Sequence, residues 1–222
     1  MRAKNRWQKA KGGVLVCFAL KEEAAPFRKI AAKESGISVL VTGIGRRNAE
    51  KSVRDFLDGN SPELILTCGF AGGLNPDLKP GDVIFEIGNR KSEIGNELLA
   101  AGARPAKFFC ANRIAVTVAE KKELREETGA DAVEMESEAI QTVCQERGIP
   151  CITIRAISDR ADEDLPLDFN RLSKPDQSLN YGKLFLAIAK SPGKIGALRR
   201  LQKNAKFAAE RLAQVLEKIT AS

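Results

Sequence analysis

Residues 130–162, ADAVEMESEAIQTVCQERGIPCITIRAISDRAD, decide the fold that the sequence predicts. They contain two acidic motifs about one helix apart, Val133-Glu134-Met135-Glu136-Ser137 and Arg155-Ala156-Ile157-Ser158-Asp159. Each motif closes an apolar run of the kind that strands buried on both faces require. Residues 138–147 have helical spacing and stop at a glycine, Gly148, so this stretch predicts a β-α-β unit.

A β-α-β unit predicts where its charged residues meet. With a right-handed crossover, both strands end at the same edge of a parallel sheet, where open α/β folds bind ligands. We therefore expect Glu136 and Asp159 to face one crevice. The whole pattern of apolar runs and helical segments predicts an α/β fold, a single-domain three-layer sandwich with a mostly parallel, twisted central sheet flanked by helices.

The other elements follow from hydrophobic spacing and from Gly and Pro punctuation. We expect strands at residues 14–20, 37–41, 64–68, 83–87, 113–118 and 151–157. We expect helices at residues 21–33, 46–57, 93–101, 119–128, 138–147 and 192–219. Residues 160–175, rich in Asp and Pro, read as a loop over the site, and residues 88–106 are the least readable part of the chain.

Composition limits the chemistry. The chain has 222 residues with 43% hydrophobic content, enough for one core-forming domain at residues 14–222 after a basic leader at residues 1–13. Five cysteines without a C-x-x-C pair indicate neither disulfides nor zinc. No histidine is present, which excludes Ser-His-Asp and Cys-His schemes. Acid–base chemistry must fall to carboxylates, and we expect neither a metal nor a cofactor.

The charge of the chain has two readings. The net charge is +7, with the excess in the leader and the last helix. This excess is either a solvated basic surface or a surface for an anionic partner. A nucleic-acid partner ranks last because the chain has one Trp, one Tyr and no known motif. The longest N-terminal apolar run, residues 14–20, is too short to span a bilayer, so we expect a cytoplasmic protein.

Two glycine-rich turns follow predicted strands. Thr42-Gly43-Ile44-Gly45 leads into a helix, where Gly45 and Arg46 are candidates for holding a phosphate, although the dinucleotide fingerprint stops at Asn48. Gly69-Phe70-Ala71-Gly72-Gly73-Leu74 follows the third strand, and its glycines suggest a backbone close to a ligand. Glu23 lies just past the first strand, either as a functional carboxylate or as a surface residue matching the helix dipole.

Taken together, the segment from Ala19 to Glu23, the second glycine turn and the two acidic motifs resemble the nucleoside phosphorylase and nucleosidase superfamily, which cleaves purine N-glycosidic bonds. The resemblance covers most of residues 14–162 and is nearest to the methylthioadenosine/S-adenosylhomocysteine nucleosidases. The tail, with Leu165-Pro166-Leu167-Asp168 and the last helix, looks more like the hopanoid-associated phosphorylases that act on adenosylhopane. The resemblance implies a nucleoside substrate and a homo-oligomer, a dimer by analogy.

The resemblance also implies roles for individual residues. Asp159 would be the acid that protonates the leaving purine, and its pKa would need to be raised by burial. Glu136 would bind the ribose hydroxyls, Met135 would pack against the sugar, and Glu23 with Arg155 would orient and deprotonate the attacking water. The remaining residues implied in substrate binding are Glu134, Ser158, Val118, Gly69, Phe70, Ala71 and Gly72.

Departures from the family keep alternatives open. Phe70 replaces a serine that helps hold the water, and the adenine loop is shortened around residues 116–120, which would admit a large 5′ substituent. The phosphate loop of the phosphorylases is missing, leaving only Arg46 and Arg47 at the Gly45 turn. We therefore favour a nucleosidase over a phosphorylase or a non-catalytic nucleoside-binding module. The last helix either covers the sheet or contacts a membrane carrying a lipid-linked nucleoside.

Overall fold

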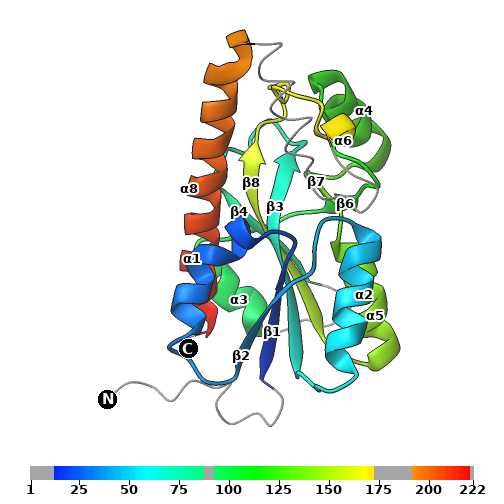
Figure 1. Cartoon of the computed structure of the whole chain (residues 1–222), viewed down its shortest axis with the longest axis vertical. Helices are drawn as coiled ribbons and strands as arrows, with labels where there is room; N and C mark the ends of the chain where they lie inside the picture. Colours follow the sequence, from blue (N-terminus) through cyan, green and yellow to red (C-terminus); the bar gives the residue numbers. More distant parts are fainter. Residues whose placement is uncertain (1–12, 88–92, 173–191, 221–222) are drawn as a thin grey trace.

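The computed structural model describes residues 13–87, 93–172 and 192–220, and the predicted leader lies almost wholly outside them. It is an α/β fold with a mixed, mostly parallel sheet between two layers of helices, as predicted (Figure 1). The strands are β1 (Val14–Phe18), β2 (Ile37–Val41), β3 (Leu64–Gly73), β4 (Val83–Ile87), β5 (Arg104–Pro105), β6 (Phe108–Cys110), β7 (Ala132–Glu134) and β8 (Cys151–Asp159). Their main order is β2-β1-β3-β8-β4-β5.

Helices cover both faces of this sheet. The helices are α1 (Lys21–Ala31), α2 (Arg46–Leu57), α3 (Glu93–Ala100), α4 (Val118–Thr128), α5 (Ser137–Arg147), α6 (Phe169–Leu172) and α8 (Ile195–Thr220), the last preceded by a 3-10 turn at Pro192–Lys194. One apolar cluster joins α1, α3 and α8 to the sheet, and another joins α2 and α5 to the opposite face. Helix α4 lies near the ends of β3, β7 and β8 (Figure 1).

Local signals set several of these boundaries. Thr117 caps α4 in a capping box with Glu120, and Gly129 ends the helix in the left-handed conformation with φ 63°. Gly148 ends α5 in the same way, with φ 66°. Gly129 and Gly148 are where the sequence predicted these helices to end, so both stops are encoded locally. The Thr117 cap was not predicted, because residues 113–118 were read as a strand.

The predicted β-α-β unit is wrong in its strand pairing. Strand β8 pairs with β3 in parallel, from Ile65 opposite Cys151 onward, whereas β7 pairs with the far end of β3 in antiparallel. Strands β7 and β8 are therefore not parallel neighbours, and β7 pairs in parallel with β6 instead. The reason is the length of β3: its glycine-rich end, predicted as a turn, continues as strand to Gly73 and offers β7 an edge.

The strand predicted at residues 113–118 is also wrong, because the strand in this region is β6, which ends at Cys110. The backbone of the next residues bonds to a distant segment: Asn170 bonds both backbone groups of Ile114, and Leu165 donates to the Val116 carbonyl at 2.8 Å. Residues 164–170, within the predicted loop over the site, thus pack on the segment before α4, and the short helix α6 begins there at Phe169.

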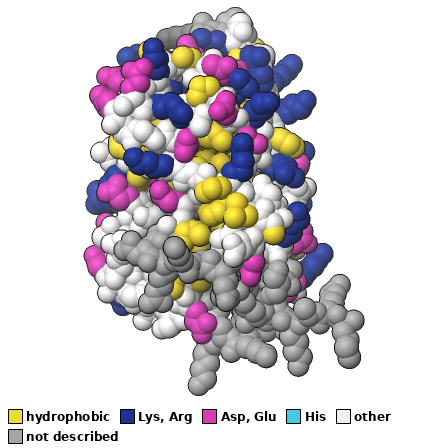
Figure 2. Space-filling view, turned by 180° about the vertical axis from the view of Figure 1, so that it is seen from behind, with side chains coloured by type: hydrophobic (Ala, Val, Ile, Leu, Met, Phe, Trp, Pro, Cys, Tyr) yellow, Lys and Arg dark blue, Asp and Glu magenta, His cyan; other side chains and the backbone are white. Residues whose placement is uncertain are grey.

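The last helix covers the sheet with its C-terminal half. Leu212, Val215, Leu216 and Ile219 are buried against α1 and the sheet. Its N-terminal half is more exposed, and Figure 2 shows basic side chains gathered in the upper right of the view, on the side where α8 lies. Across the described residues, no helix combines the length and the apolar character needed to cross a bilayer.

Candidate active site

Glu23 is buried in the first turn of α1, just past the end of β1. Its two carboxylate oxygens accept hydrogen bonds from the backbone amides of Leu20, at 2.8 Å, and Phe70, at 2.9 Å. Burial raises the pKa of this carboxyl, against these hydrogen bonds and the charge of Arg155, which lower it. A raised pKa suits a carboxylate to general base catalysis near neutral pH.

Gly69 separates Glu23 from Arg155. A Cβ atom at this position would lie 2.9 Å from Glu23 Oε1 and 3.0 Å from Arg155 Nη1, and the backbone has φ +151°. Both the space and the conformation therefore require glycine. The sequence predicted a close approach of the backbone here, and the groups that approach are the two charged side chains themselves.

Arg155 joins the acidic residues of both sequence motifs. It is 1% exposed in the middle of the sheet, and its Nη2 donates to Glu134 and to Thr67 Oγ1, the latter at 3.2 Å. Glu136 Oε2 lies 3.7 Å from the same nitrogen. A guanidinium stays charged even when buried, so it can hold several carboxylates at one place.

Glu134 is fully engaged by the protein. Its oxygens accept hydrogen bonds from the amides of Glu136 and Ser137, the Ser137 hydroxyl and Arg155. Burial acts to raise its pKa, but Arg155 and the Ser137 hydroxyl lower it to a net depressed value. Glu134 is therefore an ionised residue that fixes the start of α5 and the position of Arg155.

The Glu136 carboxylate accepts fewer hydrogen bonds from the protein than that of Glu134. Its Oε1 accepts a hydrogen bond from the Gly45 amide at 2.8 Å, and the residue is 7% exposed. Burial raises its pKa to about 7, against the charge of Arg155, and the adjacent Glu134 carboxylate adds to the rise. Glu136 therefore changes its charge near neutral pH.

The raised pKa of Glu136 predicts how the stability of the protein depends on pH. The folded state binds the Glu136 proton more tightly than the unfolded state, so the stabilisation is complete below about pH 4.5 and is lost as the pH rises through about 7. Between about pH 5 and about pH 8, wild type should lose about 1–3 kcal/mol relative to Glu136→Gln, which cannot titrate. Urea unfolding of both proteins across this range measures the difference, and parallel curves would contradict it.

The glycine turn before α2 holds protein groups. The Gly45 amide is bonded to Glu136, and Arg46 Nη2 donates to the Cys110 carbonyl at 2.7 Å and to the Glu138 carboxylate. These are the residues that the sequence offered for phosphate. In the structure, the Gly45 amide and Arg46 Nη2 donate to carboxylates and a carbonyl, whereas the buried Arg46 Nε has no hydrogen-bond partner.

Asp159 ends β8, beside Gly72 of β3. A Cβ atom on Gly72 would lie 3.3 Å from Asp159 Oδ2 and 3.3 Å from a methyl group of Val133. The structure thus brings the second acidic motif next to the strand that carries the first. Asp159 Oδ2 accepts a hydrogen bond from Lys121 Nζ at 2.7 Å, and Asp159 is 9% exposed.

Two further predicted residues surround Asp159. Ser158 donates its hydroxyl to Asp159 Oδ1 at 2.7 Å and lies at an irregularity in the pairing of β3 with β8. Ala71 is buried in an apolar cluster with Ile157. Ser158 thus touches the candidate acid directly, whereas Ala71 contributes packing beneath it.

The other predicted residues lie further from the charged cluster. The ring of Phe70 packs against the apolar cluster below α1 and α8, so Phe70 reaches the site through its backbone amide. Met135 is partly buried in the turn between β7 and α5. Val118 is 37% exposed at the start of α4, where its amide donates to Asp164 Oδ1 at 2.7 Å.

Three residues with contacts in the site were not predicted from the sequence: Lys121, Ser137 and Thr67. Ser137 is the last residue of the first acidic motif, and the available signal for Thr67 was a polar residue inside an apolar strand. Lys121 had no such signal, because it lies in a helix that reads as charged throughout. In the described part of the chain, no group of three or more Cys, Asp or Glu side chains is arranged to hold a metal ion.

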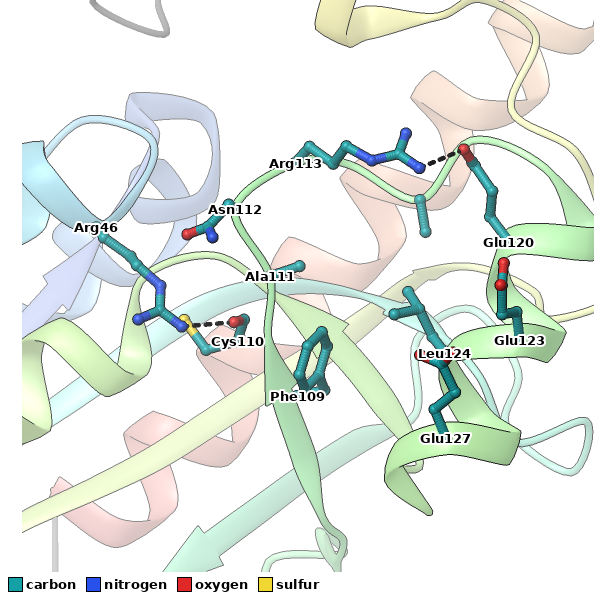
Figure 3. A pocket seen from close by; sticks show the side chains of 11 residues that line it. Arg46, Phe109, Cys110, Ala111, Asn112, Arg113, Glu120, Glu123, Leu124 and Glu127 are labelled. Atoms are coloured by element: carbon teal, nitrogen blue, oxygen red, sulfur yellow. Dashed lines mark hydrogen bonds and ion pairs between the residues drawn. The ribbon is translucent and has the colours of Figure 1, made fainter.

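A cavity of about 400 Å³ lies between α4 and residues 109–115 (Figure 3). Arg46 contributes to one wall, whereas Glu120, Glu123 and Glu127 line the α4 side. Arg113 spans its rim to Glu120 at 2.7 Å. The buried cluster around Arg155 is not part of this lining, so Arg46 is the one predicted residue that reaches the cavity.

Known proteins share both sequence and fold with this chain. A 5′-methylthioadenosine/S-adenosylhomocysteine nucleosidase of Shewanella halifaxensis is 27% identical over 176 residues, which are 64% of this chain and 76% of that protein. The protein of the same name from Glaesserella parasuis is 29% identical over 166 residues, 60% of this chain and 72% of the relative.

Solved structures show the same fold. Futalosine hydrolase of Helicobacter pylori superposes with a TM-score of 0.69 at 18% identity, covering 94% of this chain and 97% of that one. A 5′-methylthioadenosine/S-adenosylhomocysteine nucleosidase of Neisseria meningitidis, in complex with methylthio-immucillin-A, gives 0.66 at 19% identity, covering 94% and 98%. The family model described as the phosphorylase superfamily matches residues 20–85 and 103–190. Because this match spans well over half of the sequence, the chain belongs to the phosphorylase superfamily.

Proposed function

We propose that this enzyme is a nucleosidase that hydrolyses the N-glycosidic bond of a 5′-substituted adenosine and releases adenine. The observation that carries the proposal is the burial of Glu23, Glu136 and Arg155 in one cluster, with Asp159 four residues further along β8. Four residues of strand span about 13 Å, so the acid and the two glutamates are held at a fixed separation along β8. The superfamily and the nucleosidase relatives support the same reaction.

The residues divide the reaction between them. The glycosidic bond breaks with its electron pair on the purine, and Asp159 donates a proton to a purine ring nitrogen. Water attacks the sugar carbon, and Glu23 takes a proton from that water. Glu136 accepts hydrogen bonds from the ribose hydroxyls and opposes the positive charge that develops on the sugar. Arg155 fixes the position of both glutamates.

Water is the favoured nucleophile. A phosphate would need donors at the Gly45 turn, where the Gly45 amide is bonded to Glu136, Arg46 Nη2 is bonded to Cys110 and Glu138, and the buried Arg46 Nε has no hydrogen-bond partner. Binding phosphate there would break contacts to two carboxylates and would place an anion beside both. A water molecule needs neither change.

The test is base release from adenosine, 5′-methylthioadenosine and S-adenosylhomocysteine, with and without inorganic phosphate. We expect free adenine and a free sugar, at a rate that phosphate does not change. A sugar phosphate product would make the enzyme a phosphorylase. No release from any of the three, together with a rise in melting temperature on nucleoside addition, would favour the non-catalytic binding module.

Glu136→Gln tests the ribose site. The charged carboxylate makes stronger hydrogen bonds to hydroxyls than an amide does. The substitution should therefore lower kcat/KM far more for ribonucleosides than for their 2′-deoxy analogues. The ratio of kcat/KM values for the two sugars, in wild type and variant, measures this effect. Equal losses for both sugars would remove Glu136 from the ribose site.

A lipid-linked nucleoside such as adenosylhopane is the substrate that the last helix favours. The exposed part of α8 carries Arg199, Arg200, Lys203 and Lys206 together with Phe207, which is 49% exposed. Each basic residue near an anionic membrane adds on the order of 1 kcal/mol of attraction. Replacing the four basic residues by Gln should reduce salt-sensitive flotation with anionic vesicles and leave cleavage of soluble 5′-methylthioadenosine unchanged. Wild type that does not float at low salt would assign α8 to covering the sheet alone.

A further inference from the structure

Lys121 is a fully buried lysine whose ammonium lies against the candidate acid. It is 0% exposed, and its Nζ donates to Asp159 Oδ2 at 2.7 Å, to the Arg160 carbonyl at 2.6 Å and to the Glu163 carbonyl at 2.9 Å. These three bonds use all three protons of the ammonium. Lys121 therefore ties α4 to the end of β8 and to the chain that follows it.

The location of Lys121 is unfavourable for a lysine in other respects. Burial disfavours an ammonium, and a position near the start of α4 places it at the positive end of the helix dipole. Its neighbour Lys122 has the ordinary arrangement, an exposed side chain paired with Glu126 at 3.7 Å. The side chain that its ammonium contacts is the carboxyl group of Asp159.

The other charged groups near Asp159 are directed elsewhere. The Arg160 guanidinium bonds to Asp162 at 2.7 Å, and the Glu163 carboxylate pairs with Arg200 at 3.3 Å. Both residues present only their carbonyls to Lys121. From β3 the group facing Asp159 is Gly72, which carries no charge, and from β8 it is the Ser158 hydroxyl. Among the described residues, Lys121 is thus the cation in contact with Asp159.

We propose that Lys121 is a positioning residue for Asp159, which orients the acid and stabilises the carboxylate left after the proton moves to the purine. The proposal rests on the nucleosidase reaction proposed above. As the bond to the base breaks, the proton passes from Asp159 to the base, and the new negative charge on Asp159 forms in contact with the ammonium. An ammonium in contact favours the proton-free form of a carboxyl group, so it makes the acid a better donor.

The test is the pH profile of kcat for Lys121→Met on the adenosine derivative that wild type cleaves best. Because an ammonium in contact favours the ionised form of a carboxyl group, removing it should move the alkaline fall in kcat upward by about one pH unit or more. At neutral pH, kcat should drop about 100-fold through misplacement of the acid, with a smaller change in KM. A lysine that served stability alone would lower the melting temperature without moving the alkaline limb.

Two further variants make the result specific. Lys121→Arg keeps the charge and should keep the alkaline limb of wild type while recovering part of kcat, and Lys122→Met, the same change one residue away on the exposed side of α4, should match wild type throughout. If Lys121→Met does not fold, Lys121→Gln, which still donates to a carbonyl, carries the same expectation.

The outcomes separate this inference from the proposed function. Base release by wild type with an unmoved limb in the folded Met or Gln variant overturns the role of Lys121 and leaves the nucleosidase intact. A Lys121→Arg enzyme whose limb moves as far as that of Lys121→Met also overturns it. Wild type that releases no base from any nucleoside overturns the proposed function and this inference with it.

Discussion

Asp159→Asn is expected to lower kcat for base release about 100- to 10,000-fold, while nucleoside binding changes little. The amide keeps the shape of the carboxyl group but has no proton to transfer to the purine. Because the buried Lys121 ammonium would then contact a neutral amide in place of an ionisable carboxyl group, the variant should also unfold at a lower temperature than wild type. Single-turnover rates and nucleoside titrations measure the two functional effects separately.

Asp162→Asn is the matched control for this experiment. Asp162 lies three residues further along the chain, has a side chain that is 59% exposed and pairs with Arg160. The same substitution there should leave turnover within about twofold of wild type, because exposed ion pairs contribute little. Near-normal turnover of Asp159→Asn would remove Asp159 from the role of general acid.

Arg155→Met is expected to cost about 3–5 kcal/mol of stability, because it leaves Glu134 and Glu136 buried without their shared cation. The loss should shrink as the pH falls. Arg155 lowers the pKa of Glu136, so without it that pKa rises further above its unfolded value, and protonation restores stability to the variant on the acid side. Urea unfolding of wild type and Arg155→Met at about pH 8 and about pH 5 measures the loss of stability and its change with pH.

Arg147→Met is the control for this experiment, because Arg147 is an arginine at the C-terminal end of α5. Arg147 has a side chain that is 45% exposed and lies 3.5 Å from Asp58, so its replacement should change stability by about 0.5 kcal/mol or less at either pH. If Arg155→Met were no less stable than Arg147→Met, the buried carboxylates would not depend on the guanidinium. That result would also weaken the assignment of Arg155 as the centre of the site.

The elements were more predictable than their arrangement. Helix α2 and strand β4 have the predicted bounds, because glycine turns and apolar spacing are properties of the local sequence. The pairing of β7 with Gly72 and Gly73 depends on a strand some 60 residues away, and no local pattern shows that a glycine-rich segment continues as strand. The misplaced strand before α4 has the same cause, since Ile114 finds its partner in Asn170.

The candidate site was predictable where residue type and motif agreed, and less so elsewhere. Glu23, Glu136, Arg155 and Asp159 were singled out, and the first three share one buried cluster. Lys121 and Lys122 are the same residue type in adjacent positions, so nothing in the sequence separates the buried one from the exposed one. What distinguishes them is the pair of carbonyls after β8, whose position depends on the complete fold.

The central position of β8 has a consequence for local unfolding. Strand β8 is paired with β3 on one edge and with β4 on the other, so its amides are protected from hydrogen exchange until the whole sheet opens. Residues 160–170 leave the sheet and are attached by a few hydrogen bonds to Lys121 and to the segment before α4. Opening of that segment would break these bonds without breaking the pairing of β8, so the amides of the segment should exchange before those of the strand. Arg155 and Asp159 would then keep their places on β8 during such local opening.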